Sequence, residues 1–422
     1  MEDDLEKLKD VDWIIEVVVE RLDIKKSVFE KIESLLTPGT IVTSNTSGIS
    51  ARDMCKDRSK NFRKHFAITH FFNPPRYMKL LEIVQGPDTL PEVVEVLAET
   101  CEKVLGKGIV YARDTPNFVA NRIGSFSLFY IIQAMMDLGL TIEQVDALTG
   151  PAIGNPKSAS FRTADLVGLD TLVHVADNVY EGAPNDERRE MFKPPDFINR
   201  MIEKKLLGEK TEQGFYKKTK DSEGKRVILS LGYKTLEYRP QEKVKLASLE
   251  AAKNISGTSG KIKFLFYADD VAGQFAFRQI TENLIYSANR IPEIAEDIVN
   301  VDNAVKWGFG REMGPFETWD AIGVSNSVSK MKRAGHQVPA WVREMLDSGK
   351  ESFYKREAGV LYFFDLASRD YKEVPVKPGI IHLPSLKDRE KKVAGNKGAS
   401  LIDLGDGIAC LEFHSKMNAL GD

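Results

Sequence analysis

The stretch from Thr43 to Val84, which includes TSNTSGIS (43–50) and THFFNPPRYMKLLEIV (69–84), decides the fold prediction for this chain. His70 ends one apolar run, and Glu82 lies inside the next, from Leu80 to Val84. A charged group within a hydrophobic strand is costly unless it has a partner. A carboxylate is a suitable partner for a histidine, because it orients the ring and raises its basicity. We therefore expect His70 and Glu82 to form a pair.

The sequence on both sides of this stretch alternates between strand and helix patterns, which predicts a largely parallel, doubly wound sheet. Strands are predicted at 11–20, 41–44, 67–72, 80–84 and 108–112, and helices at 23–36 and 91–105. A sheet of this kind usually opens with a strand, a glycine-rich turn and a helix that holds a pyrophosphate. No GxGxxG occurs near the N-terminus. Two interpretations stay open: the sheet never bound a dinucleotide, or its opening unit precedes the chain.

A helical segment follows from Asp114 and then recurs. Phe161-x-x-x-Asp165-Leu166-Val167-Gly168-Leu169 returns as Phe316-x-x-x-Asp320-Ala321-Ile322-Gly323-Val324, and Asp146 returns as Asp302. We expect two all-α domains. The predicted domain boundaries are 1–113 for a partial sheet domain, 114–241 and 262–376 for the helical copies, 242–261 and 377–397 for linkers, and 398–422 for a β tail with a hairpin turning at Asp406-Gly407.

Composition excludes several classes of protein. The net charge of −3 over 422 residues provides no general attraction to nucleic acid, and no run is long enough to insert into a membrane. The three cysteines are far apart without CxxC spacing, which argues for a reducing compartment and against a disulfide framework or a zinc site. We expect no metal site. We expect a cytoplasmic protein.

The motifs resemble the 3-hydroxyacyl-CoA dehydrogenase family. The matching residues, in family order and spacing over about 1–376, are SNTS (44–47), HFFNP (70–74), KLLE (79–82) and Asp114-Thr115-Pro116-x-Phe118-x-x-Asn121-Arg122. Two tandem helical domains resemble the multifunctional fatty-acid oxidation proteins, in which a crotonase-like domain follows. The tail, with His414-Ser415-Lys416-Met417-Asn418-Ala419-Leu420, is similar to the opening hairpin of that domain.

The resemblance implies a fold and a set of roles. The fold is the C-terminal part of a Rossmann-like sheet, two domains like the 6-phosphogluconate dehydrogenase C-terminal domain, and a short β tail. His70 is expected to be the general base and Glu82 its orienting carboxylate, with Ser47 and Asn121 binding substrate oxygens. Residues implied to contact the cofactor NAD are Glu20, Lys25, Ser47 and Asn73.

The implied function is NAD-dependent oxidation of L-3-hydroxyacyl-CoA to 3-oxoacyl-CoA in fatty-acid β-oxidation. The partners expected are an acyl-CoA substrate and a thiolase subunit or a second copy of the chain.

The missing glycine-rich turn departs from the family pattern, so the chain reads as truncated at both ends and impaired in NAD binding. The alternatives are an inactive structural fragment of a multifunctional protein, and a 2-hydroxyacid or sugar-acid dehydrogenase, against which HFFNP and Glu82 argue. Hydratase activity is not assigned, because its carboxylates would lie beyond Asp422. We also expect the second helical copy to pack on the first in place of a partner subunit.

Overall fold

The computed structural model describes residues 2–376, 379–415 and 418. The chain divides into two compact units, Met1–Pro339 and Ala340–Asp422. Within the predicted crotonase-like tail, Lys416, Met417, Ala419 and Leu420 lie outside the described residues. Among the helices described, none combines the length and the apolar character that crossing a membrane requires.

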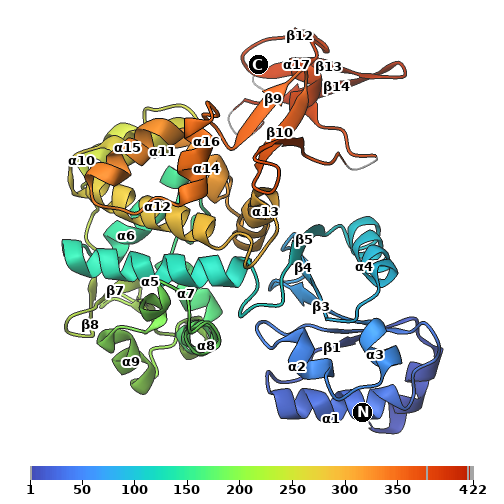
Figure 1. Cartoon of the computed structure of the whole chain (residues 1–422). Coiled ribbons are helices and arrows are strands. Elements are labelled where there is room, and N and C mark those ends of the chain that lie inside the picture. The colour runs from blue at the N-terminus through green and yellow to red at the C-terminus, as the bar shows by residue number, and fades with distance from the viewer. Residues whose placement is uncertain (1, 377–378, 416–417, 419–422) are drawn as a thin grey trace. The chain divides into compact units, whose positions relative to one another are not determined.

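The first unit opens with the short 3-10 helix η1 (Glu2–Asp10) and a five-stranded sheet (Figure 1). Its strands lie in chain order: β1 (Trp13–Glu16), β2 (Ile41–Ser44), β3 (Phe66–Phe71), β4 (Leu80–Gln85) and β5 (Gly108–Ala112). The helices between them are α1 (Leu22–Glu33), α2 (Ala51–Cys55), α3 (Lys60–Lys64) and α4 (Pro91–Lys103).

The sheet is largely parallel, as predicted, and it contains one antiparallel pairing. Strands β1 to β3 are parallel, as are β4 and β5, but β3 and β4 are antiparallel. Only eight residues, 72–79, join β3 to β4. A parallel pairing needs a crossover of a dozen or more residues, so this connection is too short for one.

Side chains alternate between the two faces of the sheet, as the strand period requires. Phe66 packs with Phe29 of α1 and Phe62 of α3, at ring-centroid distances of 5.4 and 5.5 Å. Ala67 belongs to the opposite layer, with Leu97 of α4. His70 and Glu82 share the parity of Phe66 and Val84, so both side chains project from the face that α1 to α3 cover.

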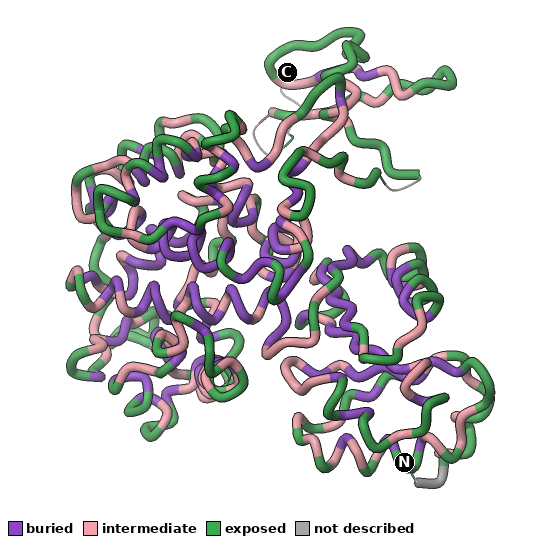
Figure 2. Tube along the Cα trace, in the orientation of Figure 1, coloured by how far each residue is buried: buried purple, intermediate pink, exposed green. Residues whose placement is uncertain are grey.

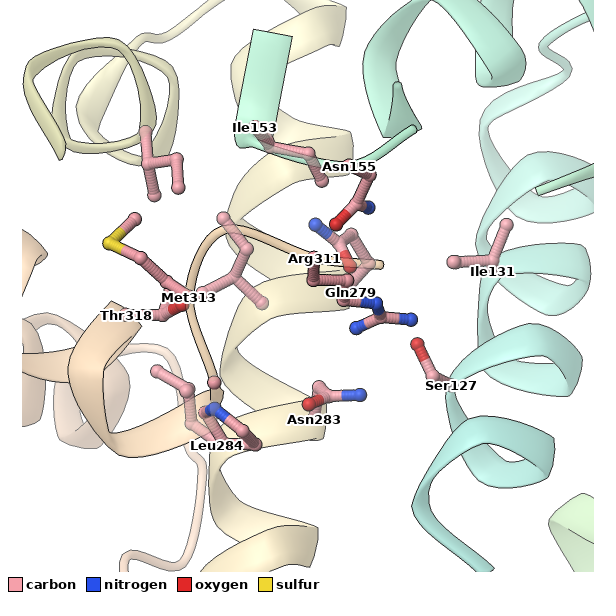
Figure 3. Close-up of a pocket in the computed structure, with 14 residues that line it drawn as sticks. Ser127, Ile131, Ile153, Asn155, Gln279, Asn283, Leu284, Arg311, Met313 and Thr318 are labelled. Atoms are coloured by element: carbon pink, nitrogen blue, oxygen red, sulfur yellow. The ribbon is translucent and has the colours of Figure 1, made fainter. Parts of the chain in front are cut away.

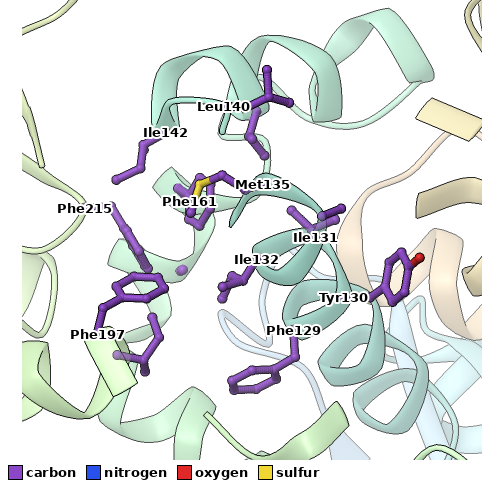
Figure 4. Close-up of a cluster of buried hydrophobic side chains, with 14 of the residues drawn as sticks. Phe129, Tyr130, Ile131, Ile132, Met135, Leu140, Ile142, Phe161, Phe197 and Phe215 are labelled. Atoms are coloured by element: carbon purple, nitrogen blue, oxygen red, sulfur yellow. The ribbon is translucent and has the colours of Figure 1, made fainter. Parts of the chain in front are cut away.

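The predicted first helical domain (the first repeat) is helical and then ends in strands. Its helices are α5 (Ala120–Leu138), α6 (Ile142–Thr149), α7 (Phe161–Val167), α8 (Leu169–Gly182) and α9 (Asp196–Glu203), with the short 3-10 helices η2 (Pro151–Ile153), η3 (Arg189–Phe192) and η4 (Glu209–Thr211). Its strands are β6 (Tyr216–Lys220), β7 (Arg226–Gly232) and β8 (Glu237–Pro240), and they form an antiparallel sheet. Figure 4 shows its core, in which Phe161, Phe197 and Phe215 gather beside α5.

The second repeat has the same order of elements. After α10 (Ala247–Ala252) and α11 (Thr258–Tyr267) come α12 (Val271–Asn289), α13 (Ile298–Phe309), α14 (Pro315–Ile322), α15 (Val324–Arg333), α16 (Ala340–Asp347), β9 (Tyr354–Glu357), β10 (Val360–Asp365) and β11 (Asp370–Glu373). Both repeats therefore close with a three-stranded antiparallel sheet, and the expectation of all-α domains is wrong. The predicted linker at 242–261 contains α10, whose Leu249 is buried in the core of the first repeat.

A buried aspartate performs the same task in each repeat. Asp146 of α6 accepts the backbone N–H of Phe161 at 2.7 Å, at the start of α7. Asp302 of α13 accepts the N–H of Phe316 at 2.8 Å and that of Glu317 at 3.1 Å, at the start of α14. Orphan donors at a helix start need such acceptors. The predicted repeat residues Asp146 and Asp302 therefore share one capping geometry.

The two repeats pack through their longest helices, α5 and α12, which are buried along much of their length (Figure 2). The rings of Phe126 and Tyr286 stack at 3.9 Å. Arg122, which is fully buried, donates to the Tyr286 hydroxyl at 2.7 Å and to the Asp186 carboxylate at 2.6 Å. The predicted packing of the second copy on the first is confirmed; its role in place of a partner subunit stays a prediction.

Helix α13 of the second repeat also packs against the sheet. A Cβ atom on Gly108 of β5 would lie 2.4 Å from the ring of Trp307, so only glycine fits there. Phe309, the last residue of α13, meets Phe72 edge-on at 6.1 Å. The second repeat therefore supports the segment that follows His70.

The second unit carries α16, β9 to β11, α17 (Leu383–Asp388) and a further sheet of β12 (Lys392–Gly395), β13 (Ala399–Gly405) and β14 (Ile408–Phe413). Strands β13 and β14 form the predicted hairpin. Asp406 and Gly407 at its turn have φ of 53° and 74°, the left-handed values that a two-residue hairpin turn requires.

Replacing Asp302 by Ala should lower the free energy of unfolding by about 1–3 kcal/mol, because buried N–H groups at the start of α14 lose their acceptor. Urea denaturation followed by circular dichroism measures the change. Glu95→Ala, at an exposed position of α4, is the control and should change stability by no more than about 0.5 kcal/mol. Equal effects of the two substitutions would contradict the capping role of Asp302.

Candidate active site

His70 and Glu82 meet directly across the antiparallel strands β3 and β4, where they are opposite residues. The Nδ1 atom of His70 lies 2.7 Å from Oε2 of Glu82. The side chains are 5% and 0% exposed, so the pair is shielded from water. Because an ionised carboxylate can only accept, Nδ1 carries the proton that it shares with Glu82. Nε2 is then the ring nitrogen left to accept a proton from a substrate.

The second oxygen of Glu82 is held by the start of α5. Oε1 accepts the backbone N–H groups of Val119 at 3.1 Å and Ala120 at 2.9 Å. These are donors that the helix itself cannot satisfy, and the N-terminus of a 19-residue helix favours a negative charge. The turn before α5 brings these donors to Glu82 through left-handed residues, Asn117 with φ of 61° and Phe118 with φ of 53°. Both oxygens of the buried carboxylate thus have partners.

Aromatic rings surround the histidine. The Phe72 ring lies 4.7 Å from the His70 ring and the Phe118 ring 5.5 Å from it. Phe118 is fully buried. The two rings restrict the orientation of the imidazole and make one side of the site apolar.

The loop after β2, which carries Ser47, is fixed to the segment before α5. Asp114 accepts the Ser50 hydroxyl at 2.8 Å and the N–H of Ala51 at 2.9 Å, at the start of α2. A Cβ atom on Gly48 would lie 2.6 Å from Oδ1 of Asn117, which shows how closely the two segments approach. Asn121 is the residue after Ala120, so it lies on the first turn of α5 beside the Glu82 carboxylate. The structure therefore brings the segments of Ser47, Glu82 and Asn121 together.

Glu20 and Lys25 belong to a buried ionic cluster at the end of β1. Lys25 of α1 is 1% exposed, and its Nζ atom lies 2.9 Å from Oε1 of Glu16 and 3.3 Å from Oε2 of Glu20. Glu20 also accepts the N–H of Ser47 at 2.8 Å, and so it ties this cluster to the loop that carries Ser47. Asn73 lies apart from the cluster, exposed on the β3–β4 connection.

Two family profiles match the chain: "3-hydroxyacyl-CoA dehydrogenase, NAD binding domain" over residues 1–115 and "3-hydroxyacyl-CoA dehydrogenase, C-terminal domain" over residues 118–218. A probable 3-hydroxybutyryl-CoA dehydrogenase of Deinococcus radiodurans is 31% identical over 51% of this chain and 74% of its own length. The chain belongs to the 3-hydroxyacyl-CoA dehydrogenase family.

Longer relatives match more of the chain. A probable 3-hydroxyacyl-CoA dehydrogenase of Bacillus subtilis is 51% identical over 100% of this chain and 52% of its own length, so the chain spans about half of that relative. A crystal structure of a 3-hydroxybutyryl-CoA dehydrogenase from Escherichia coli covers 82% of the chain and 84% of its own length, with a TM-score of 0.58 at 22% identity, and shows the likeness of fold.

These residues form only part of a binding site for NAD, the cofactor of the family. Glu20, Ser47 and Asn73 offer polar groups, but the glycine-rich turn that would hold a pyrophosphate occurs nowhere in residues 1–115. Lys25 is already paired with Glu16 inside the protein. In this position Lys25 can hold the Glu20 carboxylate in place, but it is not free to contact a cofactor directly.

Two residues of the candidate site were not singled out from the sequence. Glu16 lies within the apolar run 13–19, where, like Glu82, it is a charge in a hydrophobic strand that needs a partner. Asp114 was recognised only as part of a motif. Its role in holding α2 depends on a contact over 64 residues of sequence, which no local pattern reveals.

Replacing Lys25 by Met should lower the free energy of unfolding by about 3–5 kcal/mol, because the Glu16 carboxylate then stays buried without a counter-charge. The double variant with Glu16→Gln should recover much of that loss. Lys26→Met is the matched control: Lys26 pairs with Asp57, which is 58% exposed, so the change should be at most about 1 kcal/mol. A double variant no more stable than Lys25→Met alone would refute the pairing.

Proposed function

We propose that this chain provides the acid–base centre of an NAD-dependent L-3-hydroxyacyl-CoA dehydrogenase of fatty-acid β-oxidation. The observation that carries the proposal is the geometry of the dyad: Nδ1 of His70 is occupied by Glu82 at 2.7 Å, which leaves Nε2 for a substrate proton. A probable 3-hydroxyacyl-CoA dehydrogenase at 51% identity supports the choice of substrate class.

Oxidation of a secondary alcohol removes a proton from oxygen and a hydride from carbon. In our proposal Nε2 of His70 accepts the proton of the 3-hydroxyl group. The ring then becomes an imidazolium, whose charge the Glu82 carboxylate stabilises from the Nδ1 side. In the direction of reduction, His70 returns the proton to the 3-oxo group. NAD, when bound, supplies the hydride acceptor.

The amide groups that bind Glu82 contribute to this chemistry. If the carboxylate rotated freely, the histidine ring would not be held in one orientation. The N–H groups of Val119 and Ala120 fix Oε1 and direct Oε2 at Nδ1. Orientation within hydrogen-bond reach is what a general base requires.

Substrate and cofactor positions follow from the same arrangement. Ser47 and Asn121 are proposed to hydrogen-bond the oxygens of the acyl group, since their segments converge beside Glu82. Glu20, Ser47 and Asn73 are proposed for the nicotinamide side, with Lys25 holding Glu20. The cytoplasmic location and a thiolase subunit or second copy as partner stay predictions; one relative, from Rickettsia felis, is called a putative fatty acid oxidation complex trifunctional enzyme.

A second candidate is a structural part of a multifunctional β-oxidation protein that does not bind NAD. Two observations favour it. The pyrophosphate-binding turn is missing from residues 1–115. Strand β1 forms one edge of the sheet, and Ile15 in it and Val17 just after it are 39% and 68% exposed, which leaves apolar side chains without cover.

Turnover of acetoacetyl-CoA with NADH, followed by the absorbance of the nicotinamide, separates the two candidates. We expect His70→Gln to reduce turnover by a factor of roughly 10² or more, because the base is lost while the fold is kept. His65→Gln is the matched control: His65 precedes the same strand and its ring contacts only the Asn61 carbonyl, at 2.9 Å, in the described part of the chain.

The control should retain its activity. Near-normal turnover of His70→Gln would refute the base assignment. A chain that binds acetoacetyl-CoA but shows no turnover at any NADH concentration would support the structural candidate instead.

A further inference from the structure

A small cavity lies between the two repeats, away from the His70–Glu82 pair. It has a volume of about 50 Å³ and is lined by residues of α5, α12 and the segment between α13 and α14 (Figure 3). About 10–15 Å³ is enough for one water molecule, so the cavity has room for a small polyatomic ion. Its polar side chains are Ser127, Asn155, Gln279, Asn283, Arg311 and Thr318.

The end of α13 places Arg311 at the cavity. Gly310, with φ of 63°, ends the helix in the left-handed conformation, and the N–H of Arg311 then bonds back to the Lys306 carbonyl at 3.0 Å. This helix ending is common and fixes the direction of the next side chain. As a whole Arg311 is half-buried, while its guanidinium lies among protein atoms at the cavity.

Nothing in the described residues neutralises this guanidinium. The neighbouring Glu312 is bonded to the Thr258 hydroxyl, and Glu317 pairs with Lys306 at 2.5 Å. Burial lowers the pKa of Arg311 to about 10, and no nearby carboxylate opposes that effect. The half-buried guanidinium contacts the Phe309 ring, at 5.5 Å, but no carboxylate pairs with it in the described part of the chain. Arginine remains protonated at neutral pH. The site therefore lacks a negative charge.

A second group at the cavity lacks a partner as well. Asn283 is 8% exposed, and its buried Nδ2 atom has no hydrogen-bond partner among the described residues. Gln279, one helical turn earlier on α12, is also buried and lines the same cavity. The guanidinium and the Asn283 amide group both donate hydrogen bonds, so together they call for an anionic acceptor.

We propose that this cavity binds a phosphate-class oxyanion, which Arg311 and Asn283 hold between the two repeats. The anion supplies the charge that Arg311 lacks and accepts the free Nδ2–H of Asn283. Because the cavity is lined by both α5 and α12, the bound anion stabilises the contact between the repeats. The ligand is either free phosphate or a phosphate group of a coenzyme A thioester.

Calorimetric titration of the whole chain with inorganic phosphate, in an oxyanion-free buffer of matched ionic strength, tests the proposal. We expect saturable binding and a rise in the melting temperature of about 2–4 °C at ten times the dissociation constant. Arg311→Met should weaken binding at least about tenfold, because it removes the charged donor. Arg333→Met, at an exposed position of α15, should bind phosphate as the unmodified chain does.

Asn283→Asp provides a second test, in which the Arg311 guanidinium is kept and a negative charge is added beside it. The new carboxylate lies at the cavity, so it should pair with Arg311, raise the melting temperature in phosphate-free buffer and abolish phosphate binding. Absence of saturable phosphate binding by the unmodified chain, or unchanged binding by Arg311→Met, would overturn the proposal.

Competition identifies the source of the phosphate group. If coenzyme A displaces inorganic phosphate but pantetheine, which has no phosphate, does not, the ligand is the thioester. If phosphate binds equally well in the presence of coenzyme A, the site takes the free ion. The phosphate titration is independent of dehydrogenase activity, so an inactive His70→Gln or an inactive chain leaves this test intact.

Discussion

The buried carboxylate of Glu82 is the group on which the site depends. One of its oxygens meets His70, and the other meets two backbone N–H groups at the start of α5. A carboxylate in an apolar interior needs each of these partners, since an unpaired charge there is strongly unfavourable. Glu82 therefore determines where the first repeat begins relative to β3 and β4. The same contacts that make the charge tolerable also orient the histidine.

Two further constraints keep this arrangement in place. Asp114 fixes the loop of Ser47 to the segment before α5 by holding the start of α2. On the other side, Trp307 and Phe309 of α13 press against Gly108 and Phe72. The second repeat thus supports the sheet as well as the first repeat. This explains how a duplicated domain can matter to a site that lies on the sheet and at the start of the first repeat.

Much of the fold was predictable because it follows local patterns. Apolar runs of strand length predicted all five strands of the sheet, and Asp406-Gly407 predicted the tail hairpin with its left-handed turn. The recurrence of Asp146 as Asp302 predicted the duplication. The antiparallel direction of β4 was not predicted. The general alternation of strands and helices suggested a parallel sheet, and the length of the β3–β4 connection, which is too short for a crossover, was not considered. The three-stranded sheets that end the two repeats lay outside the all-α prediction.

In the candidate site, too, some features were predictable from the sequence and others were not. His70 and Glu82 could be chosen from sequence, because a charge in an apolar strand has to be paired and the order of motifs limits the candidates. Glu16 followed from the same rule and was overlooked. What the sequence by itself determined was the identity of the paired groups and the repeat of the helical domain. Only the tertiary structure decided that Lys25 is buried against Glu16 and that the first N–H groups of α5 bind the Glu82 carboxylate. It also decided that Arg311 lines a cavity in which no described carboxylate pairs with it. All three arrangements depend on contacts between residues far apart in the chain.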